Sequence, residues 1–213
     1  MAIGMTDDEL TRCATTFGTP LYAYDERELR ARVAFLRERL PEHVELCYAM
    51  KANTFVVPEL EQIVDGLEVC SPGEESICAE LGVSQDKLVI SGVHKDADLI
   101  DALVSSGAPV RAYTIESLSQ LEMIASAATR HATRVPVLLR LTSGSQFGMD
   151  ASVVEDVVRD HAADPALDIL GIQYFSGTQK DSIKRLSREL TKLDAFVHGL
   201  EEETGFSIRV LEF

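Results

Sequence analysis

The chain has 213 residues, 46% hydrophobic and 26% charged, which is typical of a globular protein with a buried core. Its net charge of −15 predicts that it binds neither nucleic acid nor anionic membranes, because both would repel it. No apolar run approaches the roughly 20 residues of a membrane span, and the N-terminus lacks the features of a signal peptide. The four cysteines have no metal-ligand spacing, so we expect no metal site and a reducing, cytoplasmic location.

The predicted helices begin after Asp25, which forms an N-cap pair with Glu28 ahead of apolar residues at helical spacing. The stretch SPGE at 71–74 predicts a second helix, because it supplies a serine cap, a proline at the first position and the glutamate of a capping box. Gly82 ends that helix. Asp150 and Asp181 are each expected to open a further helix.

Short apolar runs rich in β-branched residues separate these helical segments and predict strands. In chain order they are VELCYAM, LEVCS, KLVISG, VRAYTI, RVPVLLRL, ILGIQYF and IRVLEF. Alternation of strand and helix indicates a parallel sheet with helical crossovers, either open and doubly wound or closed as a (β/α)8 barrel. The first strand is followed by KANTF, which lacks the glycine-rich turn of a nucleotide-binding sheet, so the barrel is favoured.

In such a barrel the chemistry lies where the strands end. The predicted strand ends carry Lys51, Ser71, the segment 92–95, Arg140 and the segment FSGTQ at 175–179. A lysine pushed toward an apolar interior becomes nucleophilic and can form a Schiff base, although a lysine at a strand end is usually a solvated charge. The small-residue turn can present backbone N–H groups to a phosphate, although most such turns have no ligand.

Eight motifs follow one another along the chain: TPLYAYD, YAMKAN, GLEVCSPGE, LVISGVHK, LLRL, QFGMD, GIQYFSGTQ and RVLEF. Their order resembles the N-terminal half of the ornithine/diaminopimelate/arginine decarboxylases, which are pyridoxal-phosphate enzymes with an alanine-racemase-like barrel. The resemblance covers nearly the whole chain. It implies a TIM-type α/β barrel, pyridoxal 5′-phosphate as the cofactor, and the loss of an amino acid's α-carboxylate as CO2.

The resemblance also implies roles for individual residues. Lys51 would hold the cofactor as a Schiff base, Glu68 would stand where the family has an aspartate near that lysine, and Arg140 would lie beside the phenolic side of the cofactor ring. Gly177 and Thr178 would occupy the phosphate-binding positions of the family's HIGSQ motif. Phe175 replaces the histidine that stacks on the cofactor, so an aromatic face is kept while its hydrogen bonding is lost.

Two alternatives to a decarboxylase remain open. An amino-acid racemase of the same fold usually has a tyrosine four residues after the lysine, where this chain has Phe55. A non-catalytic single-barrel carrier of pyridoxal phosphate is the other alternative, but carriers also need a phosphate loop near the end of the barrel.

The motifs run out at RVLEF, so residues 1–213 are expected to form one incomplete barrel domain of about seven strands without the family's C-terminal β-domain. The resemblance places the partner of the pyridine nitrogen and a catalytic cysteine and tyrosine in later segments, so this chain alone is expected to be inactive. Unprotected strand edges predict self-association, most simply as a homodimer.

Overall fold

The structure, a computed structural model, describes residues 4–178 and 180–213. Gln179, the last residue of the motif GIQYFSGTQ, lies outside the described residues, as do the first three residues of the chain. The protein divides into two compact units, Met1–Leu67 and Glu68–Phe213.

The first unit begins with a helix that the sequence patterns above did not predict. Thr6 caps it through a reciprocal capping box with Glu9. The described elements of this unit are α1 (Asp7–Phe17), α2 (Glu26–Arg37), β1 (Cys47–Ala49), the 3-10 turns η1 (Met50–Ala52) and η2 (Thr54–Val56), and α3 (Val57–Leu60). The strand β2 (Gly66–Val69) leads from this unit into the second.

Asp25 caps α2 as predicted, but its partner is Arg27 and not Glu28. The Asp25 carboxylate accepts a hydrogen bond from the Arg27 backbone N–H at 2.9 Å and binds the Arg27 guanidinium as well. Between α2 and β2, the Asp65 carboxylate accepts from the backbone N–H of Leu46, and the Leu46 carbonyl accepts from the N–H of Asp65 at 2.9 Å. This exchange fixes β1 alongside the start of β2.

The second unit alternates strands and helices in the predicted order. Its elements after β2 are α4 (Pro72–Leu81), η3 (Gln85–Lys87), β3 (Leu88–Ile90), α5 (Ala97–Ser105), β4 (Ala112–Ile115), α6 (Leu118–Arg130), β5 (Val135–Leu141), α7 (Ala151–His161), β6 (Leu167–Tyr174), α8 (Ile183–Thr204) and β7 (Val210–Glu212). Every apolar run predicted as a strand overlaps one, although β2 and β6 begin one and two residues before the predicted runs.

The strands of the second unit stand in the sheet in chain order, from β2 to β7. The pairs from β3 to β7 are parallel, and the Ser91 N–H donates to the Val69 carbonyl at 2.7 Å between the ends of β2 and β3. An open doubly wound sheet reverses its strand order at a switch point, whereas a barrel adds each strand beside the last. The observed order is that of a barrel.

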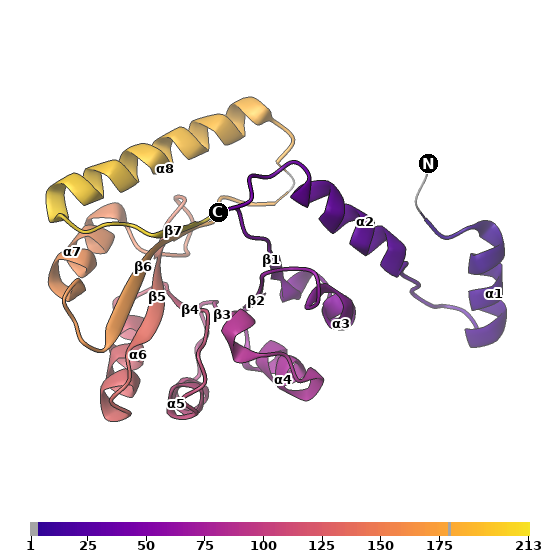
Figure 1. Cartoon of the computed structure of the whole chain (residues 1–213), viewed down its shortest axis with the longest axis horizontal. Coiled ribbons are helices and arrows are strands. Elements are labelled where there is room, and N and C mark those ends of the chain that lie inside the picture. The colour runs from indigo at the N-terminus through magenta and orange to yellow at the C-terminus, as the bar shows by residue number, and fades with distance from the viewer. Residues whose placement is uncertain (1–3, 179) are drawn as a thin grey trace. The chain divides into compact units, whose positions relative to one another are not determined.

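The helices α5, α6, α7 and α8 lie outside the curled strands β4–β7 (Figure 1). The strands contribute apolar side chains that are almost fully buried, among them Val89, Ala112 and Leu138, which pack together with Leu170. Strands with two covered faces need such continuous apolar runs. This packing fixes the positions of the strands. The polar residues of the sheet lie mainly at the strand ends.

The start of α4 differs from the predicted capping box in one partner. The Ser71 hydroxyl accepts from the Glu74 N–H at 3.2 Å, as expected, but the Glu74 carboxylate accepts from the N–H of Cys70 at 2.9 Å instead of from Ser71. Gly82 ends α4 in the left-handed conformation, as predicted. Asp150 precedes α7 but its side chain makes no capping hydrogen bond.

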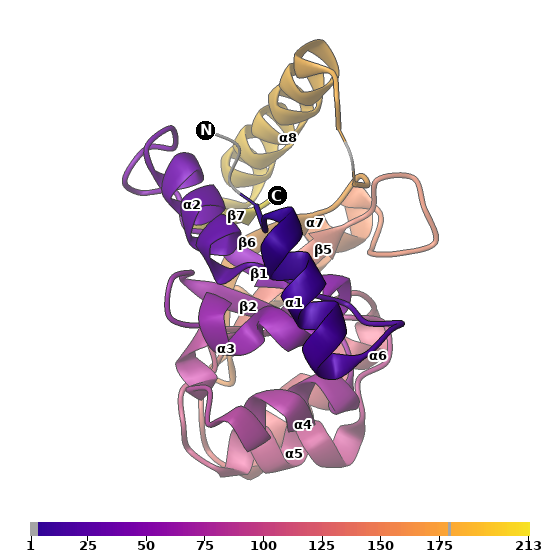
Figure 2. The same ribbon diagram turned by 90° about the vertical axis from the view of Figure 1, so that its right-hand side faces the viewer.

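The helix α8 is capped by Ser182, one residue after the predicted Asp181. Between β5 and α7 the segment 142–150 forms a wide loop (Figure 2). Its base is closed by hydrogen bonds between Thr142 and Met149 at 2.9 Å and between Met149 and Arg140 at 2.8 Å. Within the described part of the chain, no helix is both long enough and apolar enough to span a membrane.

Candidate active site

The carboxyl ends of β5, β6 and β7 place three polar side chains in one row. Arg140 is the register partner of Gln173, and Gln173 is the register partner of Glu212. Because neighbouring residues in register on parallel strands point to the same face, these three side chains share one face of the sheet. They form the centre of the candidate site.

Gln173 connects this row to Glu68 on β2. Its amide nitrogen donates to Glu212 at 2.8 Å and lies 3.4 Å from a Glu68 oxygen, although the two residues are 105 positions apart in sequence. Gln173 is 3% exposed, and its side-chain carbonyl oxygen has no hydrogen-bond partner among the described residues. The site therefore contains a buried acceptor that a donor from a ligand can satisfy.

The carboxylates of Glu68 and Glu212 both lie near the Gln173 amide, and together they form an acidic wall of the site. Burial raises the pKa of Glu212 above its ordinary value, and the nearby charge of Glu68 raises it further, while the Gln173 hydrogen bond, Arg111 and Arg140 act in the opposite direction. A carboxyl group with a raised pKa keeps its proton to a higher pH than an exposed glutamate does.

Arg140 is held by an acidic residue that follows β4. The Arg140 guanidinium lies 2.7 Å from the carboxylate of Glu116, and the two side chains are 13% and 3% exposed. The contact lacks the alignment of a hydrogen bond, so neither Glu116 carboxylate oxygen has a hydrogen-bond partner among the described residues. The two opposite charges nevertheless attract strongly at this short distance. Glu116 therefore holds Arg140 in place as its ion-pair partner. The guanidinium carbon of Arg140 also lies over the Phe147 ring, 5.4 Å from the centre of that ring.

The turn after β6 carries the other residues predicted for the second unit. Phe175 is 44% exposed and Thr178 is exposed. Gly177 has a φ of 114°, which favours glycine, and a Cβ built there would meet no atom within 4 Å. The backbone of this turn is therefore accessible to a ligand.

Two basic side chains are linked to that turn through Glu189. The Ser176 hydroxyl donates to Glu189 at 2.8 Å, and the same carboxylate pairs with Lys180 at 3.0 Å and with Arg185 at 3.3 Å. These hydrogen bonds and ion pairs hold the pKa of Glu189 below its usual value, so it stays ionised. Lys180 and Arg185 therefore place two cations near the turn, and cations at such a position suit a phosphate group.

Lys51 belongs to the first unit. It lies in η1, directly after β1, and its side chain is exposed. Met50 beside it is fully buried. The strand-end position predicted for Lys51 is thus found in the structure, while its role as the cofactor lysine stays a prediction.

Glu68 and Arg140 are therefore placed around one polar cluster, and Phe175, Gly177 and Thr178 lie together on the adjoining turn. Sequence patterns did not assign a role to Lys95, Glu116, Gln173 or Glu212, which contribute to the same cluster. Glu116, Gln173 and Glu212 lie at or directly after the end of a strand, and Lys95 lies in the segment 92–95 after β3, but position alone does not distinguish them from solvated polar residues.

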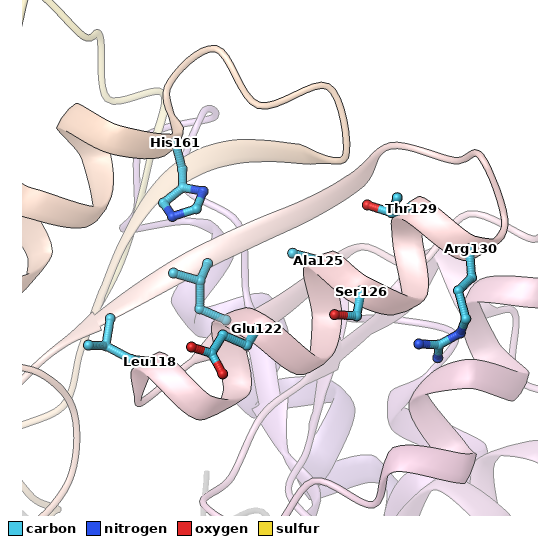
Figure 3. Close-up of a pocket in the computed structure, with 8 residues that line it drawn as sticks. Leu118, Glu122, Ala125, Ser126, Thr129, Arg130 and His161 are labelled. Atoms are coloured by element: carbon cyan, nitrogen blue, oxygen red, sulfur yellow. The ribbon is translucent and has the colours of Figure 1, made fainter.

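A separate surface pocket of about 640 Å³ lies over α6, away from these residues. Figure 3 shows Leu118, Glu122, Ser126 and Arg130 projecting from α6 and His161 from the end of α7. No predicted site residue lines it among the residues that the structure describes. The pocket lies on the helical layer, whereas barrel chemistry is found at strand ends.

Comparison with known proteins places these observations in a family. The family described as "Pyridoxal-dependent decarboxylase, pyridoxal binding domain" matches residues 26–213. A diaminopimelate decarboxylase of Aquifex aeolicus is 25% identical over 95% of this chain and 51% of its own length, and one of Pseudomonas fluorescens is 29% identical over 90% and 50%. The chain spans about half the length of the curated relatives it matches.

A solved structure supports the fold independently. The crystal structure of AQ1208 from Aquifex aeolicus superimposes with a TM-score of 0.84 at 26% identity, covering 96% of this chain and 50% of that chain. The predicted TIM-type barrel architecture is thereby confirmed. Because the match extends over most of the chain, this protein belongs to the pyridoxal-dependent decarboxylases and corresponds to their pyridoxal-binding domain.

Proposed function

We propose that this chain provides the cofactor-binding barrel of an amino-acid decarboxylase that uses pyridoxal 5′-phosphate. The observation that carries the proposal is the cluster of Glu68, Arg140 and Gln173 beside the open turn at 175–178. It supplies a buried cation, an unsatisfied acceptor and an accessible backbone turn with two cations nearby. These features match the ring substituents and the phosphate of the cofactor in charge and hydrogen-bonding capacity.

Bound pyridoxal phosphate supplies an electron sink for the electron pair that remains when an α-carboxylate leaves as CO2. The Lys51 amine would bind the cofactor's aldehyde carbon covalently. Gly177 and Thr178 would hold the phosphate through the backbone and the Thr178 hydroxyl, and Phe175 would pack on the ring. Arg140, fixed by Glu116, would bind the phenolic oxygen.

The acidic wall formed by Glu68 and Glu212 would set which groups in the site carry a proton. Glu212, with its raised pKa, would keep its proton to a higher pH than an exposed glutamate, and Gln173 would hold the Glu212 side chain in position relative to Glu68. The substrate class that we propose is an amino acid with a free α-carboxylate, in line with the diaminopimelate decarboxylases among the relatives. The family match favours this reaction over racemisation and over a carrier role.

Phosphate recognition by the turn at 175–178 gives a direct test. Binding of pyridoxal phosphate and of pyridoxal, which lacks the phosphate, is measured by equilibrium dialysis for the wild-type chain and for Thr178→Val. The variant is expected to bind pyridoxal phosphate about tenfold more weakly, the size of one hydrogen bond to a charged group. Binding of pyridoxal should not change. Equal binding of the phosphorylated ligand by both proteins would contradict the assignment of the turn.

We also propose that the protein forms a homodimer. In the second unit, β7 pairs with β6, and its residues Val210 and Leu211 are 37% and 42% exposed. Exposed apolar strand residues favour association with another chain. Light scattering at micromolar concentration should give the mass of a dimer, and a Leu211→Lys variant should shift it toward the monomer. A wild-type monomer would refute this proposal.

A further inference from the structure

Lys95 is a buried amine to which the proposed function assigns no role. It follows β3 and is 8% exposed. Its ammonium donates to the Gly92 carbonyl at 2.8 Å and to the Gln120 side-chain oxygen at 3.2 Å. Lysine is among the residues least often buried, so a lysine in this position needs a physical explanation.

The hydrogen bonds of Lys95 are not required to satisfy their acceptors. The Gly92 carbonyl also accepts from the Gln120 amide nitrogen at 3.3 Å. The Gln120 oxygen also accepts from the backbone N–H of Glu116 at 2.9 Å. If the lysine were replaced by an apolar residue of similar length, both acceptors would keep a donor, so local structure alone does not account for the amine.

Burial of the ammonium also opposes folding. Desolvation lowers the pKa of Lys95 to about 8, although Glu116, Cys70 and Glu68 favour the charged form and Arg140 opposes it. An amine with a lowered folded-state pKa binds fewer protons in the folded than in the unfolded chain between that pKa and its ordinary value. The free energy of unfolding therefore rises with pH across this range, and the charged amine lowers stability at neutral pH.

The contacts of Lys95 lead to Arg140. The Gln120 side-chain oxygen accepts a hydrogen bond from the Lys95 ammonium. The same oxygen accepts a hydrogen bond from the backbone N–H of Glu116. The Gln120 amide nitrogen donates to the Val93 carbonyl at 3.0 Å, which ties α6 to the segment that follows β3. Glu116 in turn holds the Arg140 guanidinium at 2.7 Å. With Lys95 protonated, the ammonium adds a second positive charge beside the Glu116–Arg140 pair, and Glu68 is a further negative charge that acts on it.

We propose that Lys95 is a positioning residue of the pyridoxal phosphate site, which fixes Arg140 through Gln120 and Glu116 and adds a positive charge beside that ion pair. The inference rests on the proposed function, because an added positive charge favours the anionic cofactor. It accounts for a charge that costs stability, since functional sites retain groups that a purely structural core would exclude.

The test compares Lys95→Met, Lys95→Arg and Lys192→Met, the last of which removes an exposed lysine of α8 as a matched control. The probe is pyridoxine 5′-phosphate, which has no aldehyde and so cannot bond to Lys51. Its affinity is measured at about pH 7 and at about pH 9.5, on either side of the lowered pKa of Lys95. Urea unfolding of each variant is measured under the same conditions.

Lys95→Met is expected to bind the probe roughly tenfold more weakly than wild type at neutral pH, as for other residues that orient a ligand-binding group. Its resistance to urea should be unchanged or higher. At the higher pH the difference in affinity should shrink, because wild-type Lys95 has then lost its charge. Lys95→Arg should keep more of the affinity than Lys95→Met, and Lys192→Met should behave as wild type.

Unchanged affinity of Lys95→Met at neutral pH would overturn the inference, as would a loss of affinity that accompanies a matching loss of stability. A third measurement separates this inference from the proposed function. The side-chain nitrogen signals of Arg140 are recorded by NMR without ligand, and Lys95→Met should shift them. If wild type binds no probe but these signals shift, the proposed function fails and the positioning of Arg140 stands. If the signals do not move, the positioning itself is wrong.

Discussion

Replacing Arg140 with methionine is expected to lower the free energy of unfolding by about 3–5 kcal/mol near neutral pH. Arg140 is the ion-pair partner of Glu116, whose side chain is only 3% exposed. Neither oxygen of that carboxylate has a hydrogen-bond partner among the described residues, so removal of the guanidinium leaves a buried charge without its close cation. The loss of a partner from a buried pair costs far more than the net contribution of the pair itself.

Two controls test this explanation by urea denaturation. Arg159→Met removes an arginine from a pair of the same length, 2.7 Å, but one in which both side chains are exposed, so its effect should stay under about 1 kcal/mol. The double variant Arg140→Met, Glu116→Gln removes the buried charge together with its partner and should recover much of the stability. If Arg140→Met proves no more destabilising than Arg159→Met, the buried ion pair does not have the importance given to it here.

The second large effect is expected at Lys51. Lys51→Ala should lose the covalent adduct with pyridoxal phosphate that borohydride reduction traps at this position in wild type. The chain should still fold, because the side chain is exposed and substitutions at exposed sites usually change stability by no more than about 0.5 kcal/mol. The adduct is followed by its absorbance and by the mass of the reduced protein.

Lys192→Ala, a change at an exposed lysine of α8, serves as the control for non-specific labelling. It should leave the yield of adduct unchanged. If Lys51→Ala is labelled as fully as wild type, the covalent bond forms elsewhere and the role proposed for Lys51 is wrong. Urea unfolding of both variants ensures that any loss of labelling is not a loss of folding.

The alternation of strands and helices could be predicted from the sequence because each strand is a local signal. Segments such as RVPVLLRL are apolar, β-branched and too short for a core helix, and the strand at Val135–Leu141 falls within that run. The helix ends were predicted less well. Ser182 and Asp181 are both suitable caps, and local sequence does not decide between them. The helix α1 was not predicted, although Thr6 and Glu9 have capping-box spacing.

The candidate site could be predicted only in part, because its contacts are not local. Gln173 and Glu68 meet across 105 residues, and Lys95 and Gln120 meet across 25. Nothing in the segment around Glu116 distinguishes it from a solvated glutamate at a strand end until the fold places Arg140 beside it. The motifs identified the residues expected to touch the cofactor, whereas the residues that hold them in position were found only in the structure.

The central claim, that Lys51 binds the cofactor, is tested most directly by locating the site of covalent modification in the wild-type chain. The protein is mixed with pyridoxal phosphate, reduced with borohydride and digested, and the modified peptide is identified by mass spectrometry. We expect the label on Lys51 in preference to every other lysine. Preferential labelling of Lys180, Lys184 or Lys95, with Lys51 unmodified, would contradict the account.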